Sequence, residues 1–403
     1  MIAGHPSTPA RPRLDPRVVY DVIVVGAGPA GLYTAMLIAR DGLDVLVLEE
    51  HEAIGMPTHC TGVVSAEAYD LYKIPEQVVL HRPSTCVIVS PSGTEVDLQS
   101  PGEEIAVVDR GALDQALAQS AQEAGATVVT DYRVQGVRPG SDFVEVSAEG
   151  RQSVRGRALV LACGVTYRFH RTLGFGLPVA MLHTAQLELD ARPAEALEMH
   201  VGRTVAPEGF AWLVPMKRGE RSRLKAGVLL RGDARAHLRA FLSRPPIAQR
   251  LLDDPGEPVR RLIPIGPTRR AHGDRVLAVG DAAGLTKPVT GGGIFYSLLS
   301  GALAAETLVD ALAADDLSAR RLAHYETRWR RRLMPEIHAG RWFRHLLVNL
   351  SDREFDTFVA ALASDDVRSV IARTARFNWH RAVIRALVRQ PGIKSILLRS
   401  LFR

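Results

Sequence analysis

Cysteine is scarce in this sequence, and the three that occur, Cys60, Cys86 and Cys163, have no regular spacing. Such cysteines fit neither a disulfide framework nor a zinc site, so we expect a reducing, cytoplasmic environment and no metal. A run of about 18 uncharged apolar residues is also lacking, so no membrane-spanning helix is predicted. The segment 1–17 lacks the apolar core of a secretion signal, which predicts a disordered tail.

Acidic residues are few in the last part of the chain. From Leu317 onward there are 18 Lys or Arg residues against 7 Asp or Glu residues, whereas the rest of the chain carries 32 against 37. A basic C-terminal region on a mildly acidic body is typical of a protein that contacts an anionic surface. A solvated helical face explains the charge equally well. We expect no nucleic-acid partner.

A dinucleotide-binding motif follows the first strongly apolar segment, 20–25. The segment predicts a buried strand, and GAGPAG then joins it to a helix that begins at about Ala30. Gly26 permits the tight turn, Gly28 lets a pyrophosphate approach the backbone, and Gly31 lets helix and strand pack closely.

An acidic residue at the end of the second strand narrows the choice of dinucleotide. Glu49 lies 18 residues after Gly31, close to the spacing of a ribose-binding acid. Because an acid there repels the 2′-phosphate of NADP, we expect the ADP half of FAD or NAD at this site.

Asp281 favours FAD over NAD. It follows a predicted strand, 276–279, where its carboxylate can accept hydrogen bonds from ribityl hydroxyls, which NAD lacks. Arg110 follows Asp109 at the end of another short apolar strand and precedes an amphipathic helix. Alone, Arg110 would indicate no more than a surface arginine.

Three successive glycines, Gly291, Gly292 and Gly293, precede an apolar helix that begins near Ile294, and Pro288 fixes the chain before them. Their bare N–H groups and the helix dipole would stabilise the negative charge of a reduced flavin. A glycine-rich turn between strand and helix is the simpler alternative, but it leaves Asp281 unexplained.

Together these pieces resemble the FAD-dependent oxidoreductases of the aromatic-hydroxylase superfamily, and most of all its geranylgeranyl reductase family. Two stretches carry the closer resemblance: IGMPTHCTG contains a P-x-x-C motif, and EGFAWLVP contains an aromatic-x-Trp-x-x-Pro motif. The resemblance covers about residues 18–400. It implies a discontinuous Rossmann-type α/β FAD domain, an antiparallel-sheet substrate domain and a helical C-terminal region.

The resemblance also implies an activity. In that family a donor reduces the flavin, and hydride then passes to a carbon–carbon double bond of a long isoprenoid. Cys60 would lie near the flavin and protonate the second carbon or orient the ring; a small buried hydrophobe is the alternative. The substrate pocket would include Phe210, Trp212 and Pro215, whose alternative is ordinary sheet core. The motifs and the resemblance assign to FAD Gly26, Gly28, Ala30, Gly31, Glu49, Glu50, Cys60, Arg110, Val134, Asp281, Pro288, Gly291, Gly292, Gly293 and Ile294.

Two departures from the family pattern affect the donor and the substrate. The superfamily has Ala-Asp-Gly where this chain has Ala162, Cys163 and Gly164. The missing acid puts direct reduction by NAD(P)H in doubt and makes a ferredoxin or a quinone credible as donor. Leu229 stands where the family has the second glycine of a G-x-G strand, so a shorter or different substrate is expected.

At 403 residues the chain is long enough for two or three domains. We expect a tail over 1–17 and an FAD-binding domain made of 18–80, 103–166 and 263–315. The antiparallel-sheet substrate domain takes 81–102 and 167–262, with a hairpin around Pro-Ser-Gly, and a basic helical region takes 316–403.

A basic amphipathic helix is predicted near the C-terminus. Arg381, Arg385 and Arg389 line one face, with Trp379 and Leu387 among the apolar residues of another. Such a helix can lie on anionic lipid, which would place the protein at the inner face of a membrane. The alternative is an apolar face packed on the body of the protein.

Two other functions compete with the reductase. A hydroxylase of the same fold would need oxygen and usually NADPH, and the missing acid at Cys163 argues against it. A non-catalytic prenyl-lipid carrier on a related fold would have no need of Asp281 or of the three glycines.

Overall fold

The computed structural model describes residues 14–58, 60–83, 85–98 and 105–400. Most of the predicted tail, and 99–102 of the predicted substrate domain, lie outside these residues. From the tail, the described residues 14–17 form a turn in which Arg17 pairs with Asp15. The predicted domain boundaries stay a prediction.

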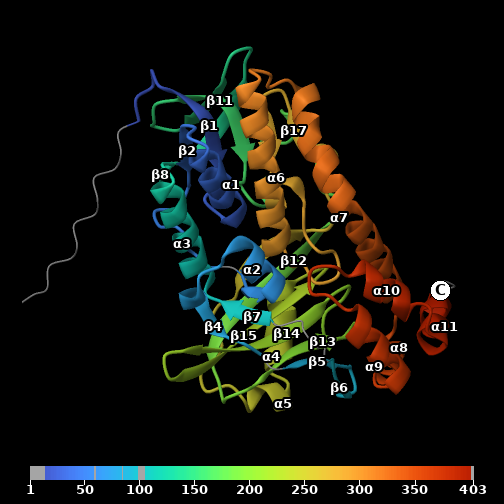
Figure 1. Cartoon of the computed structure of the whole chain (residues 1–403). Helices are drawn as coiled ribbons and strands as arrows, with labels where there is room; N and C mark the ends of the chain where they lie inside the picture. Colours follow the sequence, from blue (N-terminus) through green and yellow to red (C-terminus); the bar gives the residue numbers. More distant parts are fainter. Residues whose placement is uncertain (1–13, 59, 84, 99–104, 401–403) are drawn as a thin grey trace, which may run out of the picture.

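An eight-stranded sheet forms the upper end of the molecule in Figure 1. Its strands follow the order β17-β18-β11-β1-β2-β8, with β10 and β9 continuing from β11. The central strands are parallel runs of Val, Leu and Ile buried on both faces, which is typical of a sheet covered by helices. The strands are β1 (Val19–Val25), β2 (Val45–Leu48), β8 (Thr127–Val129), β9 (Val134–Pro139), β10 (Val144–Ala148), β11 (Val154–Leu161), β17 (His272–Gly273) and β18 (Val276–Ala278).

A seven-stranded sheet forms the lower part, in the order β16-β12-β15-β14-β13-β5-β6. All its pairs are antiparallel except that of β13 with β5. The predicted hairpin is present as β5 and β6. Two helices, α4 and α5, follow β15 in the sequence, and α4 packs on one face of the sheet, against β12 and β15. The elements are β5 (Thr85–Val89), β6 (Glu95–Asp97), β12 (Met181–Asp190), β13 (Ala196–Val201), β14 (Phe210–Arg218), β15 (Arg221–Leu230), β16 (Val259–Pro264), α4 (Ala234–Leu242) and α5 (Pro245–Ala248).

A three-stranded sheet, in the order β3-β7-β4, lies against the seven-stranded sheet, where β4 contacts β14. Its strands are β3 (Val63–Ser65), β7 (Ile105–Val108) and β4 (Val79–His81), and the short helix α2 (Ala66–Tyr72) follows β3. This sheet places the ends of the P-x-x-C segment and of the strand before Arg110 side by side.

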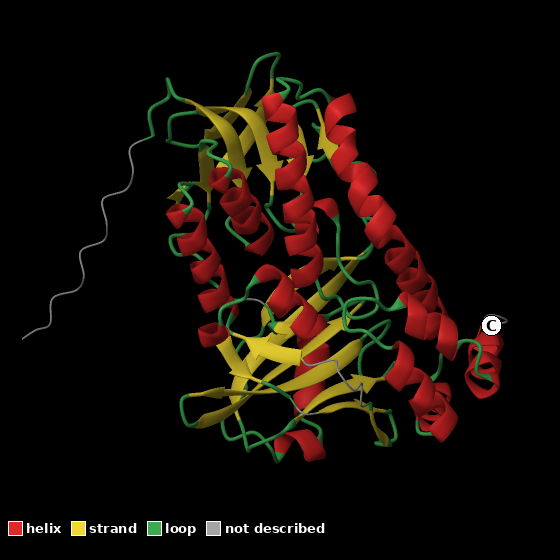
Figure 2. Cartoon of the chain, viewed as in Figure 1, coloured by secondary structure: helices red, strands yellow, loops and turns green. Residues whose placement is uncertain are grey.

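Long helices flank the large sheets, as the red ribbons of Figure 2 show. Helix α1 packs against α3 and α6, and α6 packs against α7. By length and composition α6 could span a membrane, but 67% of its most apolar window is buried inside the protein. The helices are α1 (Pro29–Arg40), α3 (Arg110–Glu123), α6 (Ile294–Ala313), α7 (Ala319–Leu347), α8 (Asp352–Leu362), α9 (Asp365–Thr374), α10 (Arg381–Leu387) and α11 (Pro391–Ser400). The predicted α/β fold class is confirmed.

The basic C-terminal helix is shorter than predicted, because it ends at Leu387 and Arg389 lies in the turn after it. Helix α10 begins at Arg381, and Trp379 lies before it, where its indole N–H donates to Glu67 and its ring packs edge-on against Phe295. Ile384 and Leu387 are buried against the body of the protein. The apolar face of α10 therefore packs on the body of the protein, mainly on α7 and α9.

Candidate functional site

The turn between β1 and α1 has the geometry that a pyrophosphate requires. Gly26 has a φ of +105°, and a Cβ there would lie 2.4 Å from the carbonyl oxygen of Ala162. A Cβ on Gly28 would meet nothing within 4 Å, so the space in front of this residue is open. Gly28 is the N-cap of α1 and supplies no side-chain cap, which leaves the first N–H groups of the helix for a ligand.

The expected ribose-binding acid is tied to the glycine turn. Glu49 follows β2, and its carboxylate accepts the N–H of Ala27 at 2.8 Å and the N–H of His51 at 3.1 Å, while the ring Nδ1 of His51 lies 2.5 Å from one of its oxygens. A carboxylate has about four lone-pair sites, so capacity for a ribose hydroxyl remains. The neighbouring Glu50 instead forms a half-exposed pair with Arg133 at 3.3 Å.

Two further residues assigned to the cofactor lie at this end of the sheet. Ala30 is buried in the first turn of α1, beside the turn at Gly280, where a Cβ would come within 3.0 Å of its methyl. Val134 begins β9, is buried, and accepts a hydrogen bond from Arg168 through its carbonyl oxygen. Because its side chain is buried, Val134 can contact a ligand only through its main-chain atoms.

Asp281 carries a partly buried carboxylate. It lies in the turn Gly280–Ala283 after β18, and no described residue donates a hydrogen bond to its carboxylate. The hydroxyl of Tyr167 fixes the turn by donating to the main-chain carbonyl oxygen at 2.6 Å. Burial raises the pKa of Asp281 to about 6, although Arg110 acts in the opposite direction. A partly buried carboxylate without hydrogen-bond donors is less stable than one that has them, and ribityl hydroxyls would supply such donors.

Arg110 faces this carboxylate from α3. Its guanidinium donates to Asp114 one turn later, at 2.9 Å, and it lies close enough to Cys60 and Asp281 to interact with both electrostatically. Burial is the largest single influence and opposes its charge, but Asp114 and Cys60 together outweigh burial and raise the pKa of Arg110. The structure thus brings Cys60, Arg110 and Asp281 together from three distant segments.

The three glycines open α6 beside Asp281. Gly293 is the N-cap without a side-chain cap, and a Cβ there would lie 3.0 Å from a carboxylate oxygen of Asp281. Gly291 has a φ of +70° and donates to Lys287. Pro288 packs against α7, where a Cβ on Gly340 would lie 3.2 Å from its ring.

Gly292 accepts a hydrogen bond from the N–H of Lys287, and a Cβ on Gly292 would lie 2.6 Å from that lysine's side chain. Ile294 is the first, buried residue of α6. The loop 287–293 is therefore closed by its own main chain, with a helix N-terminus directed at the site.

One face of the seven-stranded sheet supplies an apolar wall. Phe210 pairs with Leu229 and Trp212 with Gly227 across β14 and β15, so all four lie on the same face. A Cβ on Gly227 would lie 2.2 Å from the indole of Trp212, which therefore lies flat on the sheet. Leu229 is 3.3 Å from the position of a Cβ on Gly291, so it reaches the glycine loop.

Pro215 is placed differently from the other two predicted substrate residues. It is three positions after Trp212 on β14, and alternation puts it on the opposite face with Leu213, toward α4. A small cavity of 70 Å³ between β14, α7 and α8 extends the apolar face at Phe210 and Val289.

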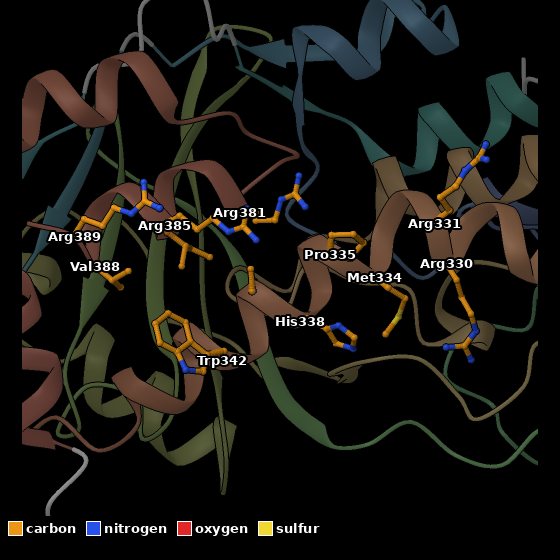
Figure 3. Close-up of a pocket in the computed structure, with 12 residues that line it drawn as sticks. Arg330, Arg331, Met334, Pro335, His338, Trp342, Arg381, Arg385, Val388 and Arg389 are labelled. Atoms are coloured by element: carbon orange, nitrogen blue, oxygen red, sulfur yellow. The ribbon is translucent and has the colours of Figure 1, made fainter.

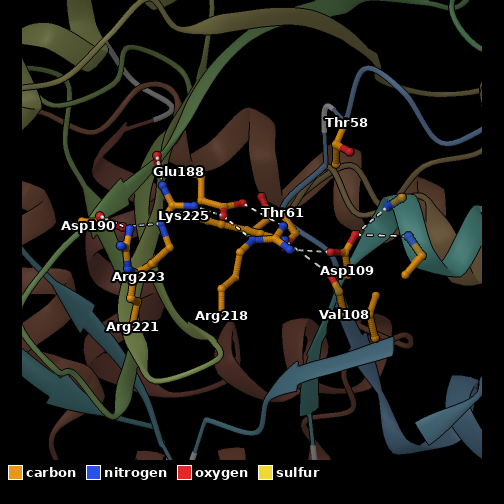
Figure 4. Close-up of polar contacts among 12 residues, drawn as sticks. Thr58, Thr61, Val108, Asp109, Glu188, Asp190, Arg218, Arg221, Arg223 and Lys225 are labelled. Atoms are coloured by element: carbon orange, nitrogen blue, oxygen red, sulfur yellow. Dashed lines mark hydrogen bonds and ion pairs between the residues drawn. The ribbon is translucent and has the colours of Figure 1, made fainter. Parts of the chain in front are cut away.

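Lys225 is a site residue that sequence reasoning missed. It lies on β15 with the same face orientation as Leu229, is 3% exposed, and donates through Nζ to the carbonyl oxygens of Thr61 at 2.9 Å and Val108 at 3.3 Å (Figure 4). Burial lowers its pKa, and Cys60 is first among the groups that act in the opposite direction. A lysine inside the otherwise apolar run 224–230 of β15 was the signal that could have found it.

Other polar contacts hold the same loop on the sheet. The hydroxyl of Thr61 donates to Gln186 on β12 at 3.2 Å. Arg218 joins Asp109 to Glu188, at 2.6 Å and 2.5 Å, at the edge of the region in Figure 4. The P-x-x-C segment is thus fixed by residues more than 100 positions away in the sequence.

Cys163 replaces the expected acid with a neutral group. It follows β11, packs behind the turn at Gly26, and its thiol donates to the carbonyl oxygen of Thr166 at 3.3 Å. Burial raises the pKa of the Cys163 thiol to about 12. No negative charge from this residue faces the site at neutral pH.

These residues fit FAD. An open glycine turn at α1 suits the pyrophosphate, the donor-poor Asp281 suits the ribityl hydroxyls, and the uncapped α6 suits the pyrimidine end of the flavin. Cys60 lies close enough to Arg110 and Lys225 to interact electrostatically with both. The arrangement can position an apolar substrate across from a flavin, with a thiol nearby.

Comparisons with known proteins agree with this geometry. Residues 19–231 match the family model described as "FAD binding domain". A protein of Methanopyrus kandleri named digeranylgeranylglycerophospholipid reductase 2 is 32% identical over 87% of this chain and 92% of its own length. One of Methanocaldococcus jannaschii, named digeranylgeranylglycerophospholipid reductase, is 30% identical over 85% and 90%.

Solved structures show the same fold. A geranylgeranyl bacteriochlorophyll reductase-like protein of Thermoplasma acidophilum superposes with a TM-score of 0.82 at 23% identity, covering 95% of this chain and 99% of that one. The halogenase PltM in complex with FAD superposes with a TM-score of 0.66 at 16% identity, covering 95% and 86%. The match over more than half of the chain and the curated relatives make this protein an FAD-dependent oxidoreductase that belongs to the digeranylgeranylglycerophospholipid reductase family.

Proposed function

We propose that this enzyme reduces carbon–carbon double bonds in the geranylgeranyl chains of a membrane glycerophospholipid. The names of its curated relatives supply the substrate class. The single structural observation that supports it is the apolar wall of Phe210, Trp212 and Leu229, which meets the glycine loop at Gly291. Such a wall suits an isoprenoid chain lying across from a flavin.

In this mechanism the protein supplies orientation and a proton. When bound, FAD supplies a hydride to one alkene carbon. The second carbon then takes a proton, and the Cys60 thiol holds one at Sγ between the apolar wall and Arg110. Lys225 keeps the Cys60 loop in place through the Thr61 carbonyl. Asp281 and the N-terminus of α6 orient the cofactor, and Trp212 and Leu229 exclude water from the reacting carbons.

The proposal includes a donor other than NAD(P)H, because Cys163 places a neutral thiol where the superfamily has an acid. We assign the two electrons to a ferredoxin or a quinone, and the location to the cytoplasmic face of a membrane where the lipid is found. Stopped-flow mixing with NADPH should bleach bound FAD slowly or not at all. Rapid bleaching would overturn the donor assignment.

The substrate proposal is tested under argon. Chemically reduced holoenzyme should be reoxidised by a digeranylgeranyl glycerophospholipid, with a mass gain of two hydrogens for each double bond reduced. Reoxidation that occurs only in air and yields a hydroxylated product would assign the hydroxylase instead. Protein that retains no FAD after reconstitution would assign the carrier.

Cys60 is tested by replacement with serine. Cys60→Ser should lower turnover by about 100-fold, at the low end of the range for general acids, while FAD content stays unchanged. Cys86→Ser, on β5, is the matched control for removal of a partly buried thiol and should retain wild-type turnover. Equal turnover of both variants would mean that Cys60 only packs in the protein and takes no part in the reaction.

A further inference from the structure

A groove between α7 and α10 lies outside the site described above (Figure 3). Its volume is about 790 Å³, more than ten times that of the cavity at Phe210. Helix α7 separates the two regions: Gly340 contacts Pro288 of the glycine loop, whereas His338 and Trp342, two positions away on either side, line the groove. The groove is therefore open to the outside of the protein and not to the flavin region.

The groove is strongly cationic. Five arginines and His338 line it, and no carboxylate is among the lining residues: the arginines are Arg330, Arg331, Arg381, Arg385 and Arg389. Glu326 neutralises Arg330 at 2.6 Å, and Glu336 lies 3.6 Å from Arg381. Within the part of the chain that the structure describes, the other three arginines have no carboxylate at ion-pair distance, and all three are exposed.

The rest of the lining is apolar. Met334, Ile384 and Val388 form part of it, and Trp342 projects into solvent with 49% of its surface exposed. A half-exposed tryptophan is typical of the boundary between water and a lipid phase, because its ring is apolar and its N–H is polar. A site that combines free guanidinium groups with apolar side chains suits an anionic amphiphile more than a hydrophilic polyanion.

We propose that this groove binds the phosphate headgroup of an anionic phospholipid in a bilayer, and so docks the enzyme on the membrane surface. Arg385 and Arg389 pair with the phosphate oxygens, Arg331 attracts the anionic surface from the other end of the groove, and Trp342 enters the interfacial layer. The charge complementarity of the groove supports this occupant. The inference does not depend on the proposed substrate, since a docking lipid need carry no geranylgeranyl chain.

The first experiment measures binding of the holoenzyme to vesicles of phosphatidylcholine with and without phosphatidylglycerol, by sedimentation. Wild type should bind only the anionic vesicles, and less at high salt. The triple variant Arg331→Gln, Arg385→Gln, Arg389→Gln should bind these vesicles about 100-fold more weakly. Each arginine near an anionic surface contributes to the affinity by roughly the same factor, so the three losses multiply. The control variant Arg40→Gln, Arg171→Gln, Arg192→Gln removes the same charge from exposed positions elsewhere and should bind normally.

The second experiment reports on Trp342 itself. Anionic vesicles should shift the tryptophan fluorescence of wild type to shorter wavelength, and Trp342→Phe should abolish the shift, because the other tryptophans are buried or half-buried. FAD content and turnover of detergent-dispersed substrate should be unchanged in all these variants, which separates this inference from the proposed function. Equal loss of binding in the control, or binding of heparin as tight as that of vesicles with no fluorescence shift, would overturn it.

Discussion

The two walls of the active site are built from different parts of the polypeptide. The wall that receives FAD is mainly main chain: the turn at Gly26, the N-terminus of α1 at Gly28 and that of α6 at Gly293. The opposite wall is made of side chains such as Lys225 and Leu229, which a sheet register brings to one face. The first wall depends on residues close together in sequence, and the second depends on pairings across the whole chain.

The largest effect that we predict is on FAD affinity and thermal stability, and it should distinguish two glycines of the first wall. Gly26→Ala forces a side chain onto a φ of +105° and against the Ala162 carbonyl, a strain of about 1–3 kcal/mol before the clash is counted. FAD affinity should fall by more than about 100-fold, and the cofactor-free protein should melt at a lower temperature. Gly28→Ala has an ordinary φ of −83° and no protein atom in its way, so its melting temperature should not change.

The same pair tests whether FAD lies against Gly28. The methyl group added in Gly28→Ala occupies the space that the pyrophosphate needs. This variant should therefore bind FAD more weakly without unfolding. Thermal melts of the cofactor-free proteins and FAD titrations followed by fluorescence measure both quantities. Wild-type FAD affinity in Gly28→Ala would contradict the placement of the cofactor.

The contrast between the walls also explains how much the sequence alone could predict. Gly26, Gly28, Gly31 and Glu49 lie within 24 residues, so a strand, a turn and a helix define their geometry locally. The same holds for the capping box of α8, whose reciprocal hydrogen bonds join Ser351 and Glu354 within four residues.

The remainder could not be predicted because it depends on register. The contact of Lys225 with Thr61 spans 164 residues and requires β15 to pair with β12 and β14 in one particular alignment. Pro215, assigned to the substrate from its motif, lies on the opposite face of β14 for the same reason. Trp379, expected on an amphipathic helix, is held by Glu67, 312 positions away.

The next prediction concerns the pH dependence of Asp281. Its pKa in the folded, cofactor-free protein is raised from 3.8 to about 6, so its contribution to stability is fully present below 3.8 and is lost as pH rises through 6. The two units correspond to about 3 kcal/mol, or roughly 100-fold. Hydroxyl donors from FAD stabilise the charged form, so FAD affinity should increase as pH rises from about 5 to 7.

Asp281→Asn should remove this dependence. At neutral pH the cofactor-free variant should be more stable than wild type, while its FAD affinity should be lower and nearly constant with pH. The surface variant Asp142→Asn is the control and should show the wild-type profile. Fluorescence titrations and thermal melts over that pH range measure both quantities, and a pH-dependent affinity that persists in Asp281→Asn would assign the effect to another group.

A smaller effect is expected on the side-chain wall at Lys225. Lys225→Met retains most of the side-chain volume but loses the hydrogen bonds to Thr61 and Val108, each worth about 1.5–3 kcal/mol for a charged donor. The Cys60 loop should loosen, and turnover should fall about tenfold while FAD content stays constant. Lys217→Met, on the exposed end of β14, is the control. A loss of FAD in parallel with turnover would instead place Lys225 on the cofactor wall.

The smallest effect should come from Leu229, and it should appear as a change of preference. Leu229 and Leu230 are both buried, but Leu229 faces the glycine loop and Leu230 faces α4. Leu229→Ala and Leu230→Ala should each lower the free energy of unfolding by about 2–5 kcal/mol, because each leaves a cavity. Only Leu229→Ala should shift kcat/KM several-fold toward lipids with longer isoprenoid chains, since only its cavity adjoins Gly291. The same shift in both variants would mean that general loosening of the sheet, and not the space beside the glycine loop, sets the length of chain that the enzyme accepts.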